Sequence, residues 1–481
     1  MSGHEIVRPR WHFSPRHGWI NDPNGLVWFK GRYHMYFQCN PYHNEWGKMH
    51  WGHAVSEDLV HWKECEPALV PDQPYEDDQK GGCFSGSVVV HGNRLYAFYT
   101  AAIEQKGKII QKQCAAYSED GFTFVKPEEN PIISECPGDS VEFRDPKVIF
   151  CKDRWQMLVG GSSGAASDLS SHGRIYLYHS RDLLHWDYDG ILYEAQDGEG
   201  TMFECPDIFK VGEKWVITAS PMNRTDFLPT LYMTGVADFR NCVFCREYTG
   251  TLDFGPHYYA SQVYRDRDNR LISVAWLGGW DWMPWIDDHG PSEENGYRGI
   301  IAFPRLISMD KAGRLQMEPY QNAAPQVSSE TEVTVRGSSV LLSDTDGTKS
   351  AVRLRGFVSR TDAVTAVKFL FCDDEHHHIE LTLDFLFGNI ITDFREADPW
   401  TRNGMRIYKA EIEREKEIRF EIIRDGNVLE VYWLDGTYNF TSMIYPTGGM
   451  LRILVSARGA AARIRYSAQE GEWMPKAASD V

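Results

Sequence analysis

Residues 25–37, with the sequence GLVWFKGRYHMYF, contain two apolar runs separated by a short polar turn that ends in a basic residue. β-Branched and aromatic residues on both sides of such a turn are typical of a β-hairpin. The pattern returns in residues 87–99 (SVVVHGNRLYAFY), 147–159 (KVIFCKDRWQMLV), 207–219 (DIFKVGEKWVITA) and 261–275 (SQVYRDRDNRLISVA). The aligned basic residues are Arg32, Arg94, Arg154, Lys214 and Arg270, so the steps are 62, 60, 60 and 56 residues. The sequence therefore predicts one β-hairpin repeated five times.

A second feature follows most of the hairpins. Ser56, Ser118 and Ser180, 62 residues apart each time, begin Ser-x-Asp triplets that precede a Trp or Phe, and a weaker copy occurs at Asp238. Ser and Asp side chains in such turns bond to nearby backbone N–H groups. We expect an edge strand that ends in a turn capped by these side chains, with the aromatic ring folded back over the unit.

The repeat also predicts the architecture. Five units of three to four strands without helix-period stretches favour a β-propeller, whereas a β-helix would need shorter repeats. From about residue 326 the period stops and alternating strands follow, which is typical of a β-sandwich. The strands expected there are 364–370, 378–386, 417–423, 428–433, 452–455 and 462–466, with turns at 425–427 and 435–437. The prediction is an all-β protein with a five-bladed β-propeller at residues 1–325 and a C-terminal β-sandwich at residues 326–481.

The composition narrows the class of partner. The formal net charge of −18 argues against binding to nucleic acid or to an anionic membrane surface. The first residues contain no apolar signal region, and no apolar run is long enough to cross a membrane. The ten cysteines are scattered, which we interpret as reduced thiols. We expect a cytoplasmic protein that acts on a small molecule.

Two motifs point to metal only weakly. Cys242 and Cys245 form a C-x-x-C pair without a second pair to complete a zinc site. Residues 373–378 (DDEHHH) fall between two expected strands, where a solvated hairpin turn is favoured over a metal site. No metal and no cofactor are predicted.

Three acidic residues, Asp22, Asp145 and Glu204, lie in turns punctuated by Pro or Gly, at intervals of 123 and 59 residues. Each is placed just before the first strand of a hairpin, at the same point of the repeat. The innermost strands of a propeller start near its axis, so the three acids are expected to converge on one central pocket. Taken singly, each acid is explained as a turn former. Three acids at matching positions favour a shared site instead.

Such a cluster of carboxylates is suited to glycosidic bond cleavage. One ionised and one protonated carboxyl group across a small pocket form the minimal machinery, and a third can hold sugar hydroxyls. The short Asp22 is assigned as the nucleophile and the longer Glu204 as the acid/base, because the longer side chain reaches a leaving-group oxygen.

Several motifs resemble those of glycoside hydrolase family 32, which contains invertases, fructan hydrolases and sucrose-6-phosphate hydrolases. The residues that carry the resemblance are 19–25 (WINDPNG), 36–41 (YFQCNP), 51–56 (WGHAVS), 84–87 (FSGS), 143–146 (FRDP), 204–207 (ECPD) and 258–261 (YYAS), with 427–446 in the C-terminal part.

The resemblance implies a retaining β-fructofuranosidase. Asp22 would attack the anomeric carbon, Glu204 would protonate the leaving oxygen and then activate water, and Asp145 would bind ring hydroxyls. The remaining substrate-binding residues that it implies are Asn21, Gln38, Trp46, Phe84, Ser85 and Arg144, with Trp280 from the Trp-rich residues 276–285. No metal or organic cofactor is implied.

Alternatives remain within and outside the enzyme class. A fructosyltransferase uses the same acids, and a catalytically silent propeller would bind fructan without cleaving it. Sucrose, sucrose-6-phosphate and short fructooligosaccharides are the expected substrates, and His43, Lys48 and His50 are the basic residues nearest in sequence to Trp46 for a phosphate group. A sandwich edge could pair across a homodimer.

Overall fold

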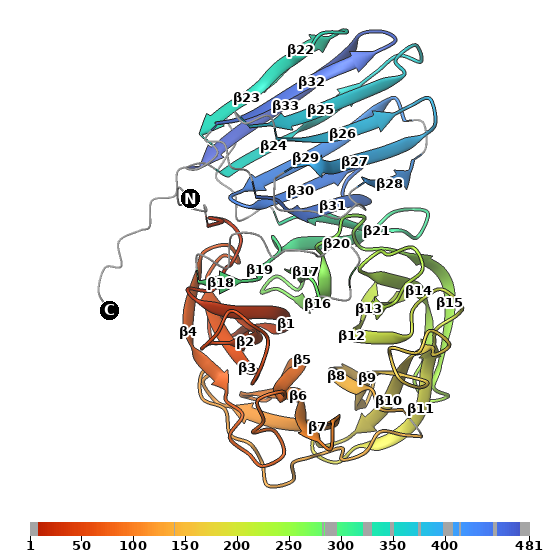
Figure 1. The fold of residues 1–481 in the computed structure, drawn as a ribbon. Helices are drawn as coiled ribbons and strands as arrows, with labels where there is room; N and C mark the ends of the chain where they lie inside the picture. Colours follow the sequence, from red (N-terminus) through yellow and green to blue (C-terminus); the bar gives the residue numbers. More distant parts are fainter. Residues whose placement is uncertain are drawn as a thin grey trace.

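The computed structural model of the chain describes residues 8–138, 140–280, 283, 296–320, 330–346, 351–373, 377–397, 407–412, 415–445 and 450–471. Over these ranges the secondary structure is built of strands and contains no helix, which confirms the all-β prediction. No helix that could cross a membrane is therefore found in the described part of the chain. Figure 1 shows two parts, a ring of sheets from the N-terminal residues and a pair of long sheets from the C-terminal residues.

Five sheets form the ring, which we define as residues 18–319. Sheet by sheet, the strands are β1 (Gly18–Phe29), β2 (Arg32–Asn40), β3 (His50–Ser56) and β4 (Trp62–Leu69); β5 (Gly82–His91), β6 (Arg94–Gln105) and β7 (Lys108–Ser118); β8 (Phe143–Cys151), β9 (Arg154–Ser162), β10 (Gly173–Ser180) and β11 (Asp187–Glu194); β12 (Met202–Val211), β13 (Lys214–Met222), β14 (Leu231–Asp238) and β15 (Val243–Gly250); and β16 (Tyr259–Arg265), β17 (Leu271–Leu277), β19 (Ile300–Ile301), β20 (Arg305–Met309) and β21 (Leu315–Pro319). The short β18 (Tyr297–Arg298) pairs in parallel with β1 and joins the end of the ring to its first sheet. In Figure 1, β1, β5, β8, β12 and β16 surround the centre of the ring.

The five hairpins predicted from the repeat are confirmed. The first four close with two-residue turns, because the last paired residues are Phe29 with Arg32, His91 with Arg94, Cys151 with Arg154 and Val211 with Lys214. Positive φ angles at Lys30, Gly92, Lys152 and Gly212 match the left-handed turns that such short loops require. The fifth hairpin, β16 with β17, ends at the pair Arg265 with Leu271 and has a longer loop.

Each innermost strand is interrupted by a β-bulge at an equivalent place. The breaks in register lie between Ile20 and Pro23, Cys83 and Gly86, Arg144 and Lys147, Glu204 and Asp207, and Tyr259 and Gln262. A bulge bends its strand and turns side chains away from the regular alternation of the sheet.

The bulges correct two details of the sequence analysis. Asp22, Asp145 and Glu204 lie inside β1, β8 and β12 rather than before them. They also occupy different positions of the bulge: Glu204 is the last paired residue before it, Asp145 is its first residue and Asp22 its second. The prediction missed this because a hydrophobic pattern does not reveal where pairing shifts by one residue.

The Ser-x-Asp turns are confirmed as capped turns. The Ser180 hydroxyl accepts a hydrogen bond from the Leu183 N–H at 2.9 Å, and Asp182 accepts one from the His185 N–H at 2.9 Å. The copies at Ser56 and Ser118 have the same bonds. The edge-strand prediction was wrong for two copies, because β3 and β10 are followed in their sheets by the outer strands β4 and β11.

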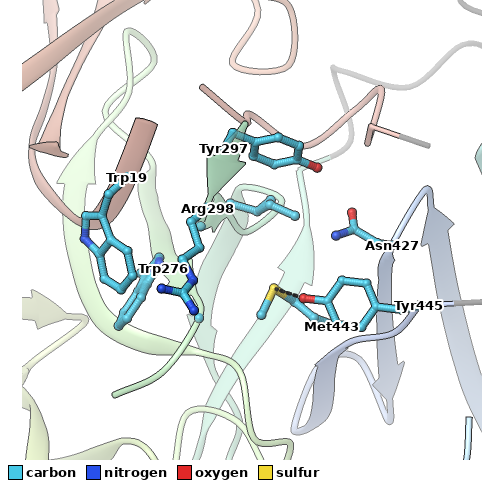
Figure 2. Close-up of a pocket in the computed structure, with 10 residues that line it drawn as sticks. Trp19, Trp276, Tyr297, Arg298, Asn427, Met443 and Tyr445 are labelled. Carbon is cyan, nitrogen blue, oxygen red and sulfur yellow. Dashed lines mark hydrogen bonds between the residues drawn. The ribbon is translucent and has the colours of Figure 1, made fainter. Parts of the chain in front are cut away.

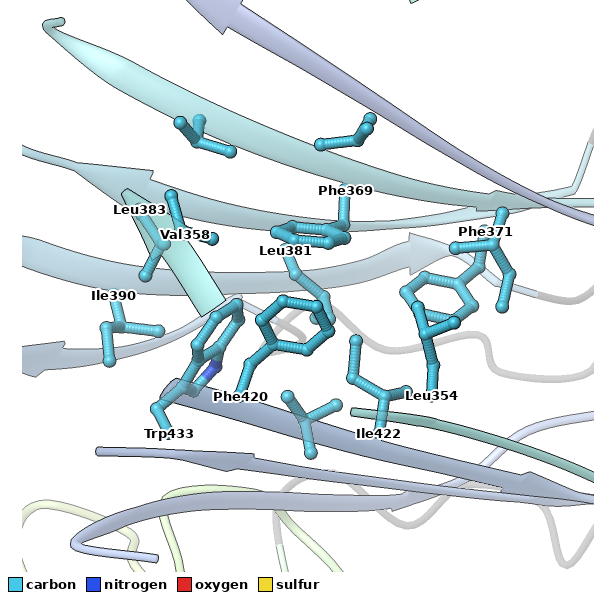
Figure 3. Packing of buried hydrophobic residues seen from close by; sticks show 14 of the residues in the cluster. Leu354, Val358, Phe369, Phe371, Leu381, Leu383, Ile390, Phe420, Ile422 and Trp433 are labelled. Carbon is cyan, nitrogen blue, oxygen red and sulfur yellow. The ribbon is translucent and has the colours of Figure 1, made fainter. Parts of the chain in front are cut away.

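Two six-stranded sheets make up the C-terminal part, here called the sheet pair (residues 330–471). One contains β22 (Thr331–Val335), β33 (Ala462–Gly471), β24 (Ala351–Ser359), β29 (Glu417–Asp425), β30 (Val428–Trp433) and β31 (Tyr438–Met443), and the other contains β23 (Val340–Asp346), β32 (Met450–Arg458), β25 (Ala366–Cys372), β26 (His378–Asp384), β27 (Asn389–Glu396) and β28 (Ile407–Glu411). Phe369 and Leu381 of one sheet face Phe420 and Trp433 of the other across a shared apolar core (Figure 3). The six strands expected here are confirmed, and the other six were not predicted.

Buried charges join the ring to the sheet pair. Arg305 of β20 lies 2.8 Å from Asp253 and 3.3 Å from Glu430 of β30. His12 lies 2.8 Å from Asp425 of β29 and 3.3 Å from Glu430. All five side chains are fully buried, so the two parts meet through a shared ionic network as well as through apolar contacts.

Candidate active site

The three predicted acids come together at the centre of the ring. Cys205, the residue after Glu204, donates its backbone N–H to Asp145 Oδ2 at 2.8 Å. Its thiol lies 3.5 Å from Asp22 Oδ2 and 3.6 Å from Asp145 Oδ2. Strands β1, β8 and β12, far apart in the chain, thus bring their carboxyl groups to one place because their bulges face the same axis.

Asp22 is held at the wall of the site by a short hydrogen bond. The Ser85 hydroxyl of β5 donates to Asp22 Oδ2 at 2.6 Å. Burial raises the pKa of Asp22, and the nearby Glu204 raises it further, whereas the hydrogen bond from Ser85 lowers it. Burial and Glu204 therefore disfavour the ionised form of Asp22, and the hydrogen bond from Ser85 favours it.

Asp145 occupies a strained and buried position. Its φ angle is 64°, in the left-handed region that a non-glycine residue seldom adopts, and its N–H donates to the Thr100 hydroxyl at 3.0 Å. Burial raises the pKa of Asp145 to about 7; Arg144 opposes this effect, while Asp22 and Glu204 add to it. Asp145 therefore gains and loses its proton near neutral pH.

Both carboxyl oxygens of Glu204 accept hydrogen bonds. Arg144 donates from Nη2 to Glu204 Oε1 at 2.8 Å and from Nε at 3.2 Å, and it also contacts Glu142. The Tyr259 hydroxyl of β16 donates to Glu204 Oε2. Although burial alone lowers it, the pKa of Arg144 is raised well above its ordinary value by Glu204, Glu142 and Asp145. Arg144 is therefore a permanent cation beside three carboxyl groups.

The other predicted binding residues make contacts with one another and with neighbouring strands. Asn21 accepts a hydrogen bond from the Trp19 indole at 2.8 Å, and Gln38 donates to the Cys83 carbonyl at 2.8 Å. The rings of Trp46 and Phe84 pack edge to face at 5.6 Å, with Trp46 37% exposed at the rim.

Trp280 packs with Trp19 at 5.8 Å and with Trp276 at 5.1 Å, and the three rings belong to one cluster with Cys205 and Tyr259. Residues 281, 282, 284 and 285 of the Trp-rich stretch lie outside the described residues.

Sequence reasoning missed several groups of the site. It assigned no role to Tyr259, Thr100, Glu142 or Trp19, although all of them touch a predicted site residue. Tyr259 aligns with Glu204 in the bulge register of the folded sheets, which the hydrophobic pattern of the sequence does not reveal.

A small cavity lies behind the aromatic wall of the site, between the ring and the sheet pair. Figure 2 shows Trp19, Trp276 and Arg298 on one side and Asn427, Met443 and Tyr445 on the other. Its volume of about 10 Å³ suits one water molecule and is too small for a sugar.

A larger cavity of about 540 Å³ opens at the other end of the ring, beyond the bulges. Its lining comes from the later halves of the innermost strands, such as residues 87–90, 147–150 and 262–267, and does not include the three acids.

The weak metal motifs do not form a metal site in the part of the chain that is described. Those residues contain no group of three or more His, Cys, Asp or Glu side chains arranged to hold an ion. Asp373 accepts the His377 N–H at 2.8 Å, while residues 374–376 of the DDEHHH stretch lie outside the described residues.

Comparisons with known proteins agree with this geometry. The chain is 32% identical over 475 residues to a raffinose invertase of Escherichia coli, covering 94% of this chain and 93% of that protein. It is 30% identical over 464 residues to a sucrose-6-phosphate hydrolase of the same species, covering 91% and 89%. A solved beta-fructofuranosidase of Bombyx mori superposes with a TM-score of 0.81 at 27% identity and covers 97% of this chain and 94% of its own, and a mutant of that enzyme was solved in complex with sucrose.

Two family models account for nearly the whole chain. The model described as "Glycosyl hydrolases family 32 N-terminal domain" matches residues 12–319, and "Glycosyl hydrolases family 32 C terminal" matches residues 320–469. The chain belongs to glycoside hydrolase family 32.

Proposed function

We propose that this protein is a retaining β-fructofuranosidase that releases β-D-fructofuranosyl units from sucrose, sucrose-6-phosphate or short fructooligosaccharides. The observation that carries the proposal is the convergence of Asp22, Asp145 and Glu204 in one buried site, reached from three separate strands. The relatives of this chain include a raffinose invertase and a sucrose-6-phosphate hydrolase, which supports the same substrate class.

In the first half of the proposed reaction, an Asp22 oxygen bonds to the anomeric carbon while the bond from that carbon to the glycosidic oxygen breaks. Glu204 gives its proton to the departing oxygen. In the second half, Glu204 takes a proton from water, the water oxygen bonds to the anomeric carbon, and Asp22 is released. The Ser85 hydrogen bond prepares Asp22 for this role by favouring its carboxylate form.

Asp145 and the polar groups nearby would hold the sugar. An ionised Asp145 accepts hydrogen bonds from ring hydroxyls, while Arg144 fixes the Glu204 carboxyl group and offers further donors. Asn21, Gln38, Phe84, Trp46 and Trp280 would complete the fructose subsite, with the aromatic rings packing on the apolar faces of the sugar.

We also propose that the five sheets of the ring are the blades of a five-bladed β-propeller. Residues 1–325 would form this catalytic domain and residues 326–481 a β-sandwich domain. A cytoplasmic location and a homodimer stay predictions.

The substrate is tested by measuring fructose release from sucrose, sucrose-6-phosphate and 1-kestose, together with glucose release from sucrose, with Asp22→Asn as the blank. Equal release of glucose and fructose from sucrose, lost in the variant, supports hydrolysis. Glucose in excess of fructose would favour the fructosyltransferase instead, and binding without release would favour the silent propeller. We expect sucrose to be preferred over its phosphate, because Lys48 is already paired with Asp77 at 2.8 Å and His50 is buried against the Lys48 carbonyl.

A further inference from the structure

A buried ion pair lies directly beyond the bulges of two acid-bearing strands. Lys147 of β8 places its ammonium group 2.7 Å from Asp207 Oδ2 of β12. Lys147 follows Asp145 by two residues, and Asp207 follows Glu204 by three. The proposed mechanism gives neither residue a role.

Lys147 and Asp207 occupy the same position of the repeat. Each is the first residue that pairs with the neighbouring strand after the bulge, as is Gln262 in β16. They form a layer next to the acids, and Lys147 and Gln262 also line the 540 Å³ cavity on the far side. The layer therefore separates the acids from that cavity.

The same pair reaches a third innermost strand. Lys147 donates to the Val263 carbonyl at 2.8 Å and to the Gln262 side chain at 3.2 Å, and Asp207 accepts the Val263 N–H at 2.7 Å. Strands β8, β12 and β16, which carry Asp145, Glu204 and Tyr259, belong to three different sheets. Backbone ladders therefore do not fix these strands to one another, and side-chain links must do so.

Two other links between β8 and β12 run through groups of the site itself, namely Arg144 with Glu204 and Cys205 with Asp145. Those contacts involve groups that bind substrate or exchange protons in the proposed reaction. The Lys147 and Asp207 link contains none of the reacting groups and is held by four hydrogen bonds among buried residues.

We propose that the Lys147–Asp207 pair is a positioning element that sets the placement of Asp145 relative to Glu204 and so controls the rate of the reaction. This inference rests on the proposed function. A contribution to stability does not by itself explain why the pair is present, because replacing a buried ion pair with apolar residues is often neutral or stabilising. A role in placing the acids explains it better, since misplacement of a catalytic group by about 1 Å can cost on the order of 100-fold in rate.

The test compares the double variant Lys147→Met/Asp207→Leu with a matched control, Lys126→Met/Glu76→Leu. The control removes another buried lysine–carboxylate pair of the ring, whose side chains are 10% and 0% exposed against 11% and 0% for Lys147 and Asp207. Lys126 and Glu76 lie outside the strands, so they do not join two acid-bearing strands. Thermal unfolding and the kcat and KM for sucrose are measured for both variants and for the wild type.

We expect both double variants to unfold at temperatures close to that of the wild type. The kcat of Lys147→Met/Asp207→Leu should fall by about 10- to 100-fold while its KM changes by less than about threefold, and the control should keep its kcat. A folded double variant with wild-type kcat, or an equal loss in the control, would overturn the proposal.

If the double variant does not fold, Asp207→Asn decides the question, because an amide keeps the shape but loses the charge. A folded Asp207→Asn with wild-type kcat overturns the positioning role, and a selective loss of kcat supports it. Failure of the proposed function has a different signature, because the wild type itself would then release no fructose from any of the sugars.

Discussion

At the scale of single residues, the site concentrates negative charge in a place that disfavours it. Asp22, Asp145 and Glu204 share a buried region with one cation, Arg144, and burial raises the pKa of both aspartates. In water, free aspartate and glutamate side chains are ionised at neutral pH. Keeping these groups together therefore lowers the stability of the folded protein, as is common at functional sites.

Replacement of Asp145 by asparagine should stabilise the protein at neutral and alkaline pH. The pKa of Asp145 is raised to about 7 in the folded state from an ordinary 3.8, so stability contributed by its protonated form is present below pH 4 and lost as the pH rises through about 7. The difference corresponds to on the order of 4 kcal/mol. Tm of the wild type and of Asp145→Asn, measured from pH 4 to pH 8, should diverge with rising pH in favour of the variant. A constant difference across this range would contradict the argument.

The sequence was sufficient to predict that the three acids converge, because each lies within two residues of a proline and the intervals between them are close to multiples of one period. The contacts of Tyr259, Thr100 and Cys205 could not be found in this way. They depend on how neighbouring bulges are offset around the ring, and that offset is set by pairing between strands rather than by local pattern.

At the scale of the elements, the same turn is used three times with different residues at its fourth position. Leu59 and Leu183 adopt φ angles of 72° and 73°, and Gly121 takes the same place with 82°. A Cβ atom on Gly121 would lie 2.5 Å from the imidazole of His34 in the first sheet. The glycine is therefore required by a contact between two sheets and not by the turn alone.

Gly121→Ala should destabilise the ring more than Gly107→Ala. Both glycines have left-handed φ angles, but a Cβ on Gly107 would meet nothing within 4 Å. The backbone strain is shared, so the difference between the two variants isolates the collision with His34, which we expect to cost about 1–3 kcal/mol. Urea unfolding of the two variants measures it, and equal losses would show that His34 moves aside freely.

The strands themselves were predicted unevenly, for physical reasons. Four of the five hairpins were found because a two-residue turn between apolar runs leaves a clear signal, and the fifth, which has a longer loop, was found from its place in the repeat. Strands such as β22, β27 and β28 were missed because they are edge or near-edge strands whose polar residues blur the alternation.

At the scale of the whole molecule, the ring and the sheet pair are joined by charges with no access to water. Burial alone would lower the pKa of His12, but hydrogen bonds and charges from Asp425 and Glu430 raise it to about 9. The protonated imidazole thus neutralises part of the charge of two buried carboxylates. The N-terminal segment that carries His12 is thereby bound to the sheet pair.

His12→Gln should lower the stability of the protein at pH 7 and lose its effect at high pH. Because the pKa of His12 is raised from 6.5 to about 9, its contribution is fully present below pH 6.5 and disappears as the pH rises through about 9. The contribution is on the order of 3 kcal/mol. Tm values of wild type and variant, compared at pH 6, 7, 8, 9 and 10, should approach each other above pH 9. A gap that stays wide at pH 10 would assign the loss to packing instead of charge.

The parallel pairing of β1 with β18 bears on how the protein is made. Gly18 pairs with Tyr297, so the first sheet is completed by residues that leave the ribosome long after the last of the three acids, Glu204. A growing chain therefore carries every proposed reacting group for some time without a closed ring to hold them. Activity should appear in a translation reaction only after synthesis has passed residue 298, as one late event and not as a gradual gain.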